Sequence, residues 1–508
     1  MKIKIHPSIL IVLAFALYLF IYWPTLYGKP IWDDYPYWFN HPFNKPEFKW
    51  LYIWKYFTWP LSVSIQRIIS SWWGKEFLYY HLFNLIVHLV NVCLLFFVLR
   101  KIKIPHAKWV CLLYLIHPAN VISVAWMIQN KTLICGFFCL LTVLTVLKAS
   151  EARKEWFALS WVLFFAAILT KASALVLPPV LFYLVWSRLK TRELLWMIPF
   201  MLISGWGVYR LMSSSVTKNA LKNLIAGEPT TTSETLNEPD ESITIDEITT
   251  EEFIPPKPPV TEKVPEITVK LKDPPEILYD FERELLIDNS NAEENPMSWL
   301  RLKSLYHYFW QAFVPNNLIP TKAFLGKDKA IIAWAHASLL LALLIALWKS
   351  PLLAPLVGAH IMLLPFIGII PAPYMNVTIV SDQHLYLVLP FFLVILVSAV
   401  SKIKLKSKTI PLLCVLLYFT YKAREIAPIW RSELHFYQAN LMYDQRNVAL
   451  AYNYCIALLQ EGEIEMAYEI GDRFYRMARQ DIKIRGDRYY PYLFQLFLQM
   501  KTLSRSPE

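Results

Sequence analysis

Long apolar runs that recur along the whole chain constrain its fold more than any other feature. Most of them are long enough, or nearly so, to cross about 30 Å of hydrocarbon as a helix. They cover residues 8–26, 78–99, 109–125, 132–147, 156–169, 174–186, 194–211, 330–348, 352–370, 385–400 and 410–421. Hydrophobic residues make up 56% of the 508 residues and charged residues only 18%, whereas soluble domains are about one quarter charged. This pattern predicts an all-α polytopic membrane protein with about 11 transmembrane helices, and it excludes an ordinary soluble enzyme and a disordered protein.

The charged residues between the runs predict how the chain crosses the membrane. Lysine and arginine gather in alternate loops, as in residues 100–108, 148–154, 188–192 and 402–408, and the short loops between them are poor in both. Because cytoplasmic loops retain basic residues during insertion, we expect a cytoplasmic N-terminus and an extracytoplasmic C-terminus. The same clusters explain the net charge of +11 without nucleic acid as a partner. Lysine-rich loops and the lack of a cysteine framework favour a bacterial inner membrane, with a periplasmic C-terminus.

Changes in composition divide the chain into four parts. Residues 1–211 form an N-terminal membrane module whose first outer loop is 27–77, and residues 212–298 form an acidic, proline-rich extracytoplasmic linker. Residues 299–429 hold an interfacial helix and the last transmembrane helices, and residues 430–508 form an extracytoplasmic helical domain. Within the linker, residues 227–296 carry 19 acidic and 5 basic side chains, and we expect this stretch to be an extended tether. Protein partners are expected at 227–296 and 430–508.

The last part contains one motif at helical spacing. Residues 447–467 read as two amphipathic helices joined by a turn at Gly462, which looks like a tetratricopeptide-type hairpin. A single hairpin of this kind cannot bury its apolar face alone. We therefore expect it to pack against neighbouring helices or against the membrane domain.

Two adjacent carboxylates, Asp33 and Asp34, follow the first apolar run directly and are flanked by aromatic residues. Carboxylates held near a low dielectric have raised pKa values unless a cation compensates. Such a pair could supply a general base that removes a proton from an incoming hydroxyl group. The alternative is a solvated pair that ends a helix.

Polar and ionisable side chains also interrupt the apolar runs. The second run carries a polar stripe of His81, Asn84, His88 and Asn91. His117 precedes Pro118 inside the third run, and Lys131, Lys171, Asp382 and His384 lie next to the ends of later runs. The two asparagines are best explained by hydrogen bonds between packed helices. The imidazoles, lysines and carboxylates fall at one predicted membrane face, where they would suit a lipid phosphate that enters sideways from the bilayer. No phosphate-binding P-loop is present, which argues against ATP-driven transport.

Six segments and the repeat-like C-terminal part, taken in order, resemble the GT-C superfamily of polytopic glycosyltransferases. The segments are Trp32–Asp34, Thr58–Ser62, Tyr80–Asn91, Leu115–Trp126, Leu169–Ser173 and Ser381–Tyr386. Within the superfamily the chain is most similar to the O-mannosyltransferase-like branch, in which tetratricopeptide repeats follow the membrane domain. The Leu115–Trp126 segment is the most specific of the six.

The resemblance implies a GT-C fold and transfer of a sugar from a polyprenyl-phosphate carrier to a protein or glycan acceptor. Asp33 or Asp34 would be the base of an inverting single displacement. The carrier phosphate would be held by residues from the set His81, His117, Lys131, Lys171, Asp382 and His384. No metal ligands are assigned, and the need for a divalent metal is left open.

The chain departs from the pattern of that family at three positions. Ala172 follows Lys171 where glutamate is expected, Asp382-Gln383-His384 stands where Asp-Arg-Tyr is expected, and Trp59 replaces an arginine. Loss of an arginine removes a bidentate phosphate donor that histidine replaces poorly. The alternative function is therefore a catalytically inactive GT-C-like membrane scaffold that recruits partner proteins through the acidic linker and the helical tail.

Overall fold

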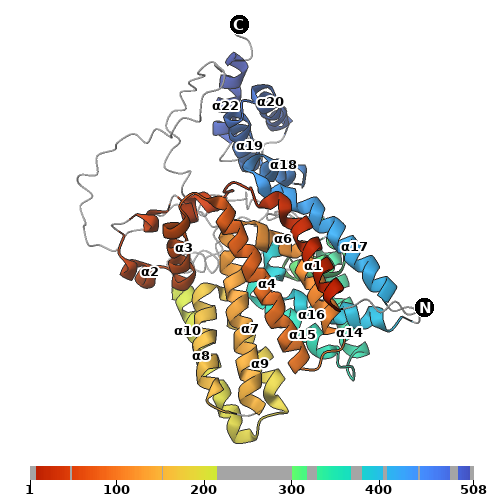
Figure 1. Ribbon diagram of the computed structural model, residues 1–508. Helices are drawn as coiled ribbons and strands as arrows, with labels where there is room; N and C mark the ends of the chain where they lie inside the picture. The colour runs from red at the N-terminus through yellow and green to blue at the C-terminus, as the bar shows by residue number, and fades with distance from the viewer. Residues whose placement is uncertain are drawn as a thin grey trace.

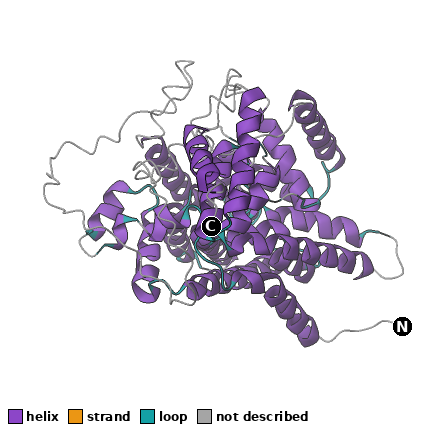
Figure 2. Cartoon of the chain, turned by 90° about the horizontal axis from the view of Figure 1, so that it is seen from above, coloured by secondary structure: helices purple, strands orange, loops and turns teal. Residues whose placement is uncertain are grey.

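A computed structural model describes most of the chain outside the acidic linker. The described residues are 7–39, 41–45, 48–151, 153–213, 300–316, 318, 329–367, 380–403, 409–443, 445, 447–480 and 490–503. The linker predicted at 212–298, including the partner segment 227–296, therefore lies almost entirely outside them. The described part is built from helices, and no β-strand occurs in it, as Figure 1 and the end-on view in Figure 2 show. The predicted all-α class is confirmed.

Every predicted apolar run is helical over most of its described length. The corresponding helices are α1 (Pro7–Tyr22), α4 (Phe77–Lys101), α5 (Ala107–Ile116), α6 (Pro118–Ala125), α7 (Asn130–Glu151), α8 (Trp156–Thr170), α9 (Leu177–Trp186), α10 (Ile198–Ser213), α14 (Lys329–Ala346), α15 (Leu353–Leu363), α16 (Leu389–Ser401) and α17 (Thr409–Ile426). Short 3₁₀ segments connect or extend several of them, namely η1 (Trp23–Thr25), η4 (Met127–Gln129), η5 (Ala172–Val176), η6 (Thr191–Met197), η9 (Leu364–Phe366), η11 (Asp382–Leu385) and η12 (Ala427–Arg431). The remaining helices are α2 (Trp50–Tyr56), α3 (Pro60–Trp73), α13 (Leu300–Phe313), α18 (Glu433–Tyr443), α19 (Val448–Gln460), α20 (Ile464–Gln480) and α22 (Tyr490–Leu503).

Several helices are apolar enough to cross a membrane, but the count of about 11 is not confirmed. In the described part, three are also long enough: Phe77–Lys101, Met127–Glu151 and Thr191–Leu211. A fourth follows if α5 and α6, which are bent by 56° at the His117–Pro118 break, count as one span. Proline lacks the N–H of a continuous helix and disfavours a helical residue before it, which explains the break. Six shorter apolar stretches have 10–17 residues, about 15–26 Å at 1.5 Å per residue: 12–25, 156–170, 172–186, 334–346, 353–366 and 389–401.

Ion pairs join three of the basic loops that were predicted to share one side, 100–108, 148–154 and 188–192, at one end of the helix bundle, whereas most of 402–408 lies outside the described residues. Glu151 pairs with Lys101 and with Arg188, whose Nη1 lies 3.0 Å from Oε1 of Glu151. Nearby, Nζ of Lys154 lies 3.1 Å from Oε1 of Glu193. Helices α2, α3 and α18–α22 lie toward the opposite end (Figure 1). The orientation of these two ends in a membrane stays a prediction.

The C-terminal part contains the expected helical hairpin. Helices α19 and α20 pack against each other and are joined by a turn in which Gly462 has a φ of +82°, a conformation that favours glycine. Helix α20 also packs on α22, where the rings of Tyr468 and Phe497 stack at 5.3 Å, and α18 packs on α19. The two predicted helices and their need for neighbours are confirmed.

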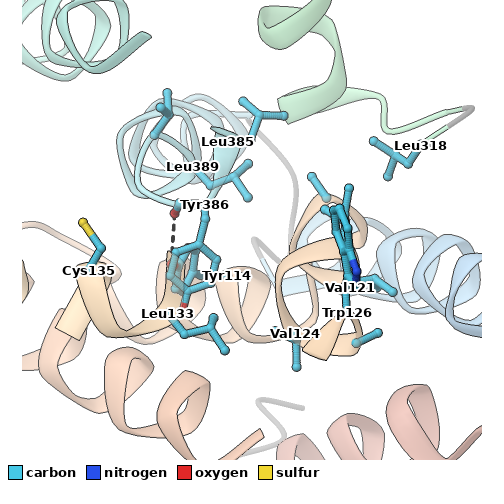
Figure 3. Close-up of a cluster of buried hydrophobic side chains, with 14 of the residues drawn as sticks. Tyr114, Val121, Val124, Trp126, Leu133, Cys135, Leu318, Leu385, Tyr386 and Leu389 are labelled. Atoms are coloured by element: carbon cyan, nitrogen blue, oxygen red, sulfur yellow. Dashed lines mark hydrogen bonds between the residues drawn. The ribbon is translucent and has the colours of Figure 1, made fainter. Parts of the chain in front are cut away.

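The polar stripe of the second run faces the interior of the bundle. Nδ2 of Asn84 donates to three carbonyl oxygens between α6 and η4, and Nδ2 of Asn91 donates to the carbonyl oxygen of Leu133 at 2.9 Å. Nδ1 of His88 lies 2.8 Å from the hydroxyl oxygen of Tyr386, whose backbone oxygen accepts from Tyr114 (Figure 3). Both asparagines therefore form hydrogen bonds with neighbouring segments, as predicted, and they hold α4 against residues 124–133.

Candidate functional site

The buried side chain of Asp34 connects the first loop to η4, the segment just before α7. Its side chain is only 1% exposed, and its two oxygens accept different backbone N–H groups. Oδ2 accepts from Ile31 at 2.9 Å, within the loop, and Oδ1 accepts from Ile128 at 2.8 Å, in η4. Burial raises the pKa of Asp34 to about 8, and the two N–H donors oppose that shift. The solvated alternative for the pair is therefore wrong for Asp34.

Asp33 lies in a different environment from its neighbour. The residue before the pair, Trp32, has a φ of +51°, and the side chain of Asp33 is half-buried instead of buried. Asp33 is close enough to Tyr437 of α18 for its charge to raise the pKa of that hydroxyl, after the larger effect of burial. The two aspartates therefore lie in different environments, and the side chain of Asp33 is the more accessible to solvent.

The start of α7 gathers polar side chains from three other elements. Nζ of Lys171, between α8 and η5, donates to Oγ1 of Thr132 at 2.6 Å, and that hydroxyl donates to Oε1 of Gln129 at 2.7 Å. On α3, Nε2 of Gln66 donates to Oδ1 of Asn130 at 3.1 Å. Together with Asp34, these contacts place side chains from the first loop, α3 and the α8–η5 junction around residues 128–132.

Electrostatic interactions join four of the predicted site residues. Lys131 acts on Asp34, where its charge favours the ionised carboxyl, and it also acts on Lys171. Burial and then the charge of Lys131 lower the pKa of Lys171 to about 7. Burial and then the charge of Lys171 hold the pKa of His384 well below its usual value. His384 is therefore neutral at pH 7 and is not a substitute for a permanent cation.

Asp382 and His384 are held by α13. Oδ1 of Asp382 lies 2.9 Å from Nε2 of His307, and the side chain of Asp382 is 1% exposed. The hydroxyl of Tyr308 lies 3.1 Å from Nδ1 of His384 and accepts from the backbone N–H of Ser381. The ring of His384 stacks on Phe366 of η9 at 3.9 Å. With the hydroxyl donating to Nδ1, the proton of the neutral ring sits on Nε2.

Two of the predicted phosphate ligands make backbone contacts in the interior. Nδ1 of His117 accepts from Ala119 and caps α6, which leaves Nε2 to donate to the carbonyl oxygen of Ala312 at 3.2 Å. Nε2 of His81 lies 3.3 Å from the carbonyl oxygen of Gly28 and ties the first loop to α4. The imidazoles of His81 and His117 thus hold backbone segments together. Asp34, Lys131, Lys171 and His384 are the predicted site residues that interact with one another electrostatically.

Several residues at this site were missed by the sequence reasoning. His307 and Tyr308 lie on the helix that was predicted only as an interfacial element, and Gln66 and Thr132 had no distinguishing spacing. The Tyr306-His307-Tyr308 triplet within an amphipathic stretch is a pattern in the sequence that could have indicated a role for His307 and Tyr308 at the site. Among the described residues, no group of three or more histidine, cysteine or acidic side chains could hold a metal ion.

Comparison of the chain with protein-family models, with curated proteins and with solved structures finds no match in any of the three. The resemblance to GT-C glycosyltransferases therefore rests on the sequence motifs and stays a prediction.

Proposed function

We propose that this chain is a multi-pass membrane glycosyltransferase of the GT-C type. It transfers a sugar from a polyprenyl-phosphate carrier to a protein or glycan acceptor by inverting single displacement. The proposal keeps the predicted 11 spans, the cytoplasmic N-terminus, the extracytoplasmic tetratricopeptide-like tail and the bacterial inner membrane. In this arrangement the short apolar helices cross the bilayer together with their 3₁₀ extensions.

One observation carries the proposal: acidic and basic residues from remote segments meet at the start of α7. Asp34 of the first loop accepts from Ile128, α7 supplies Lys131, and Lys171 at the α8–η5 junction donates to Thr132. Asp33 is the neighbour of Asp34 in the chain and lies toward Tyr437 of α18. A base and a cationic phosphate site are the two parts that such a displacement needs, since the acceptor hydroxyl loses a proton while the carrier phosphate leaves with negative charge.

The two aspartates take different roles in this proposal. Asp33 is the base, because its side chain is the more accessible of the two, whereas Asp34 is buried and accepts a backbone N–H on each carboxylate oxygen. Asp34 holds the loop in place, and Lys131 and Lys171 bind the carrier phosphate. The neutral imidazole of His384 donates a hydrogen bond from Nε2 to the same phosphate. The bond from the anomeric carbon to the phosphate oxygen breaks as the bond to the acceptor oxygen forms, and the hydroxyl proton passes to Asp33.

Replacement of Asp33 by asparagine tests this function. The purified full-length protein, in nanodiscs, is given radiolabelled polyprenyl-phosphate mannose or glucose with membranes of the source organism as acceptor, and release of polyprenyl phosphate is measured. Asp33→Asn should reduce release by at least a hundredfold, since general-base catalysis contributes about 10²–10⁴. Glu465→Gln, which changes an exposed carboxylate on α20, is the matched control and should retain full activity. Unchanged release by Asp33→Asn would refute the proposal.

The inactive scaffold is the second candidate, and specific contacts favour it. The carboxylate of Asp382 is occupied by His307, that of Asp34 by backbone donors, and Nδ1 of His384 by Tyr308. These polar groups are satisfied within the protein, as expected for a site that no longer binds a phosphate. A scaffold would tolerate Asp33→Asn and would lose its partners when residues 227–296 are deleted.

A further inference from the structure

Two histidines that lie within predicted apolar runs, His336 of α14 and His360 of α15, come close together inside the helix bundle. Their ring centroids are 5.9 Å apart, and the ring planes differ by 24°. His336 is only 1% exposed, and neither of its ring nitrogens has a hydrogen-bond partner among the described residues. The same holds for the buried Nε2 of His360. Because buried polar groups in native proteins are nearly always partnered, three unpartnered nitrogens at one place point to a ligand that binds there.

The hydrogen bond that His360 does make fixes which of its ring nitrogens can bind a ligand. Nδ1 lies 2.8 Å from the carbonyl oxygen of Leu356, one turn earlier in α15. A carbonyl oxygen only accepts, so Nδ1 carries the proton of the neutral ring and Nε2 keeps its lone pair. Histidines that bind metal ions commonly donate their other N–H to a backbone carbonyl group in this way. His360 is therefore already held in the tautomer that a metal ion requires.

The surroundings of the two histidines are aromatic. The ring of His336 meets those of Phe309 and Tyr306 of α13 at 5.8 Å and 6.1 Å, and the ring of His360 meets Phe392 of α16 at 6.2 Å. Helix α13 packs on both α14 and α16, and α15 packs on α16. Among the described residues, no third histidine, cysteine or acidic side chain joins the pair. A ligand at this place would therefore meet two imidazoles within a largely apolar environment.

These features select the class of ligand. Imidazole nitrogens bind copper and zinc ions, with the nitrogen about 2.0–2.1 Å from the metal. Two rings that share an ion at this distance have centroids about 5–6.5 Å apart, a range that includes the 5.9 Å observed here. Zinc prefers a larger set of ligands, and its double charge is more costly to bury than a single one. Copper(I), which carries a single charge and accepts two ligands, fits the pair better.

We propose that His336 and His360 bind one copper(I) ion, which joins α14 to α15. Nε2 of His360 and one ring nitrogen of His336 donate their lone pairs, and no proton has to leave, because each ligand is the unprotonated nitrogen of a neutral ring. The ion provides partners for two of the three unpartnered nitrogens and converts their burial from a cost into a link between helices. The site uses none of the residues assigned to sugar transfer, so it stands or falls separately from the proposed function.

Copper(I) binding by the full-length protein in nanodiscs tests the inference. The purified, metal-free protein competes for copper(I) with a chromophoric chelator under anaerobic, reducing conditions. Wild type should take up one ion per chain, and His336→Leu and His360→Leu should each bind about a hundredfold more weakly or less. His435→Gln, which changes an exposed histidine of α18, is the matched control and should bind like wild type. Equal binding by wild type and His336→Leu would overturn the inference.

Two further measurements separate this site from copper bound elsewhere and from a loss of folding. X-ray absorption at the copper edge should show nitrogen neighbours, and sulfur neighbours, as from Cys135 and Cys139, would overturn the inference. Without metal, His336→Leu should unfold at a temperature at least as high as wild type, because leucine removes two unpartnered nitrogens from a buried position. Copper(I) should raise the unfolding temperature of wild type by several degrees and leave that of His336→Leu unchanged. An equal rise in both proteins would also overturn the inference.

Discussion

Replacement of Asp34 by asparagine tests whether this carboxyl group holds the first loop to the helix bundle. Asparagine keeps one oxygen as an acceptor but turns an NH₂ group toward the second backbone N–H, from either Ile31 or Ile128. One buried donor is then left without an acceptor, at a cost of about 1–3 kcal/mol. We therefore expect Asp34→Asn to lower the free energy of unfolding by about 2 kcal/mol, and Asp34→Ala, which leaves both donors unpaired, by roughly twice as much.

Thermal unfolding of the full-length protein in detergent measures this loss. The matched control is Asp472→Asn on α20, which removes an exposed pair with Arg476 that is worth less than about 1 kcal/mol. Asp34→Asn should unfold several degrees below both wild type and this control. If its midpoint equals that of Asp472→Asn, the two hydrogen bonds do not hold the loop and the reasoning is refuted.

The pKa of Asp34 adds a pH dependence with a definite sign. Burial raises this pKa from 3.8 to about 8, so the folded state binds the proton more tightly than the unfolded state does. The contribution of this proton to the free energy of unfolding is fully present below pH 3.8 and is lost as the pH rises through about 8. Because asparagine does not titrate, the stability difference between wild type and Asp34→Asn should narrow from pH 6 to pH 9. A constant difference would show that the carboxyl group is ionised throughout.

Two further changes probe the phosphate site and the packing below it. Since burial lowers the pKa of Lys171 to about 7, the share of protonated lysine falls about fivefold from pH 7 to pH 8. The KM for a polyprenyl-phosphate donor should rise accordingly in wild type and stay flat in Lys171→Arg, and parallel profiles would contradict a role of this charge in binding. In α7, a Cβ atom at Gly136 would lie 2.9 Å from Cε1 of Tyr386 and 3.2 Å from Nδ2 of Asn91. Gly136→Ala should therefore destabilise the protein by about 1–3 kcal/mol, whereas Gly205→Ala, with nothing within 4 Å, should not, and equal midpoints in thermal unfolding would contradict this packing.

Much of the helical architecture could be predicted from local features. The apolar runs predicted the helices of the bundle, and the turn at Gly462 predicted the α19–α20 hairpin, because helix periodicity and a positive φ are set by neighbouring residues. The number of membrane spans was less predictable. Composition does not show where prolines and 3₁₀ segments divide an apolar run, as at His117–Pro118.

The order of the residues alone shows that two carboxylates follow the first apolar run and that basic and imidazole side chains recur in later runs. The contacts that these side chains make depend on how the helices pack. Asp33 and Asp34 are equivalent in composition, yet one is buried against a backbone N–H 94 residues away and the other is half-exposed beside α18. A side chain's burial and partners are set by segments that packing brings together from remote parts of the chain, and no local pattern encodes them.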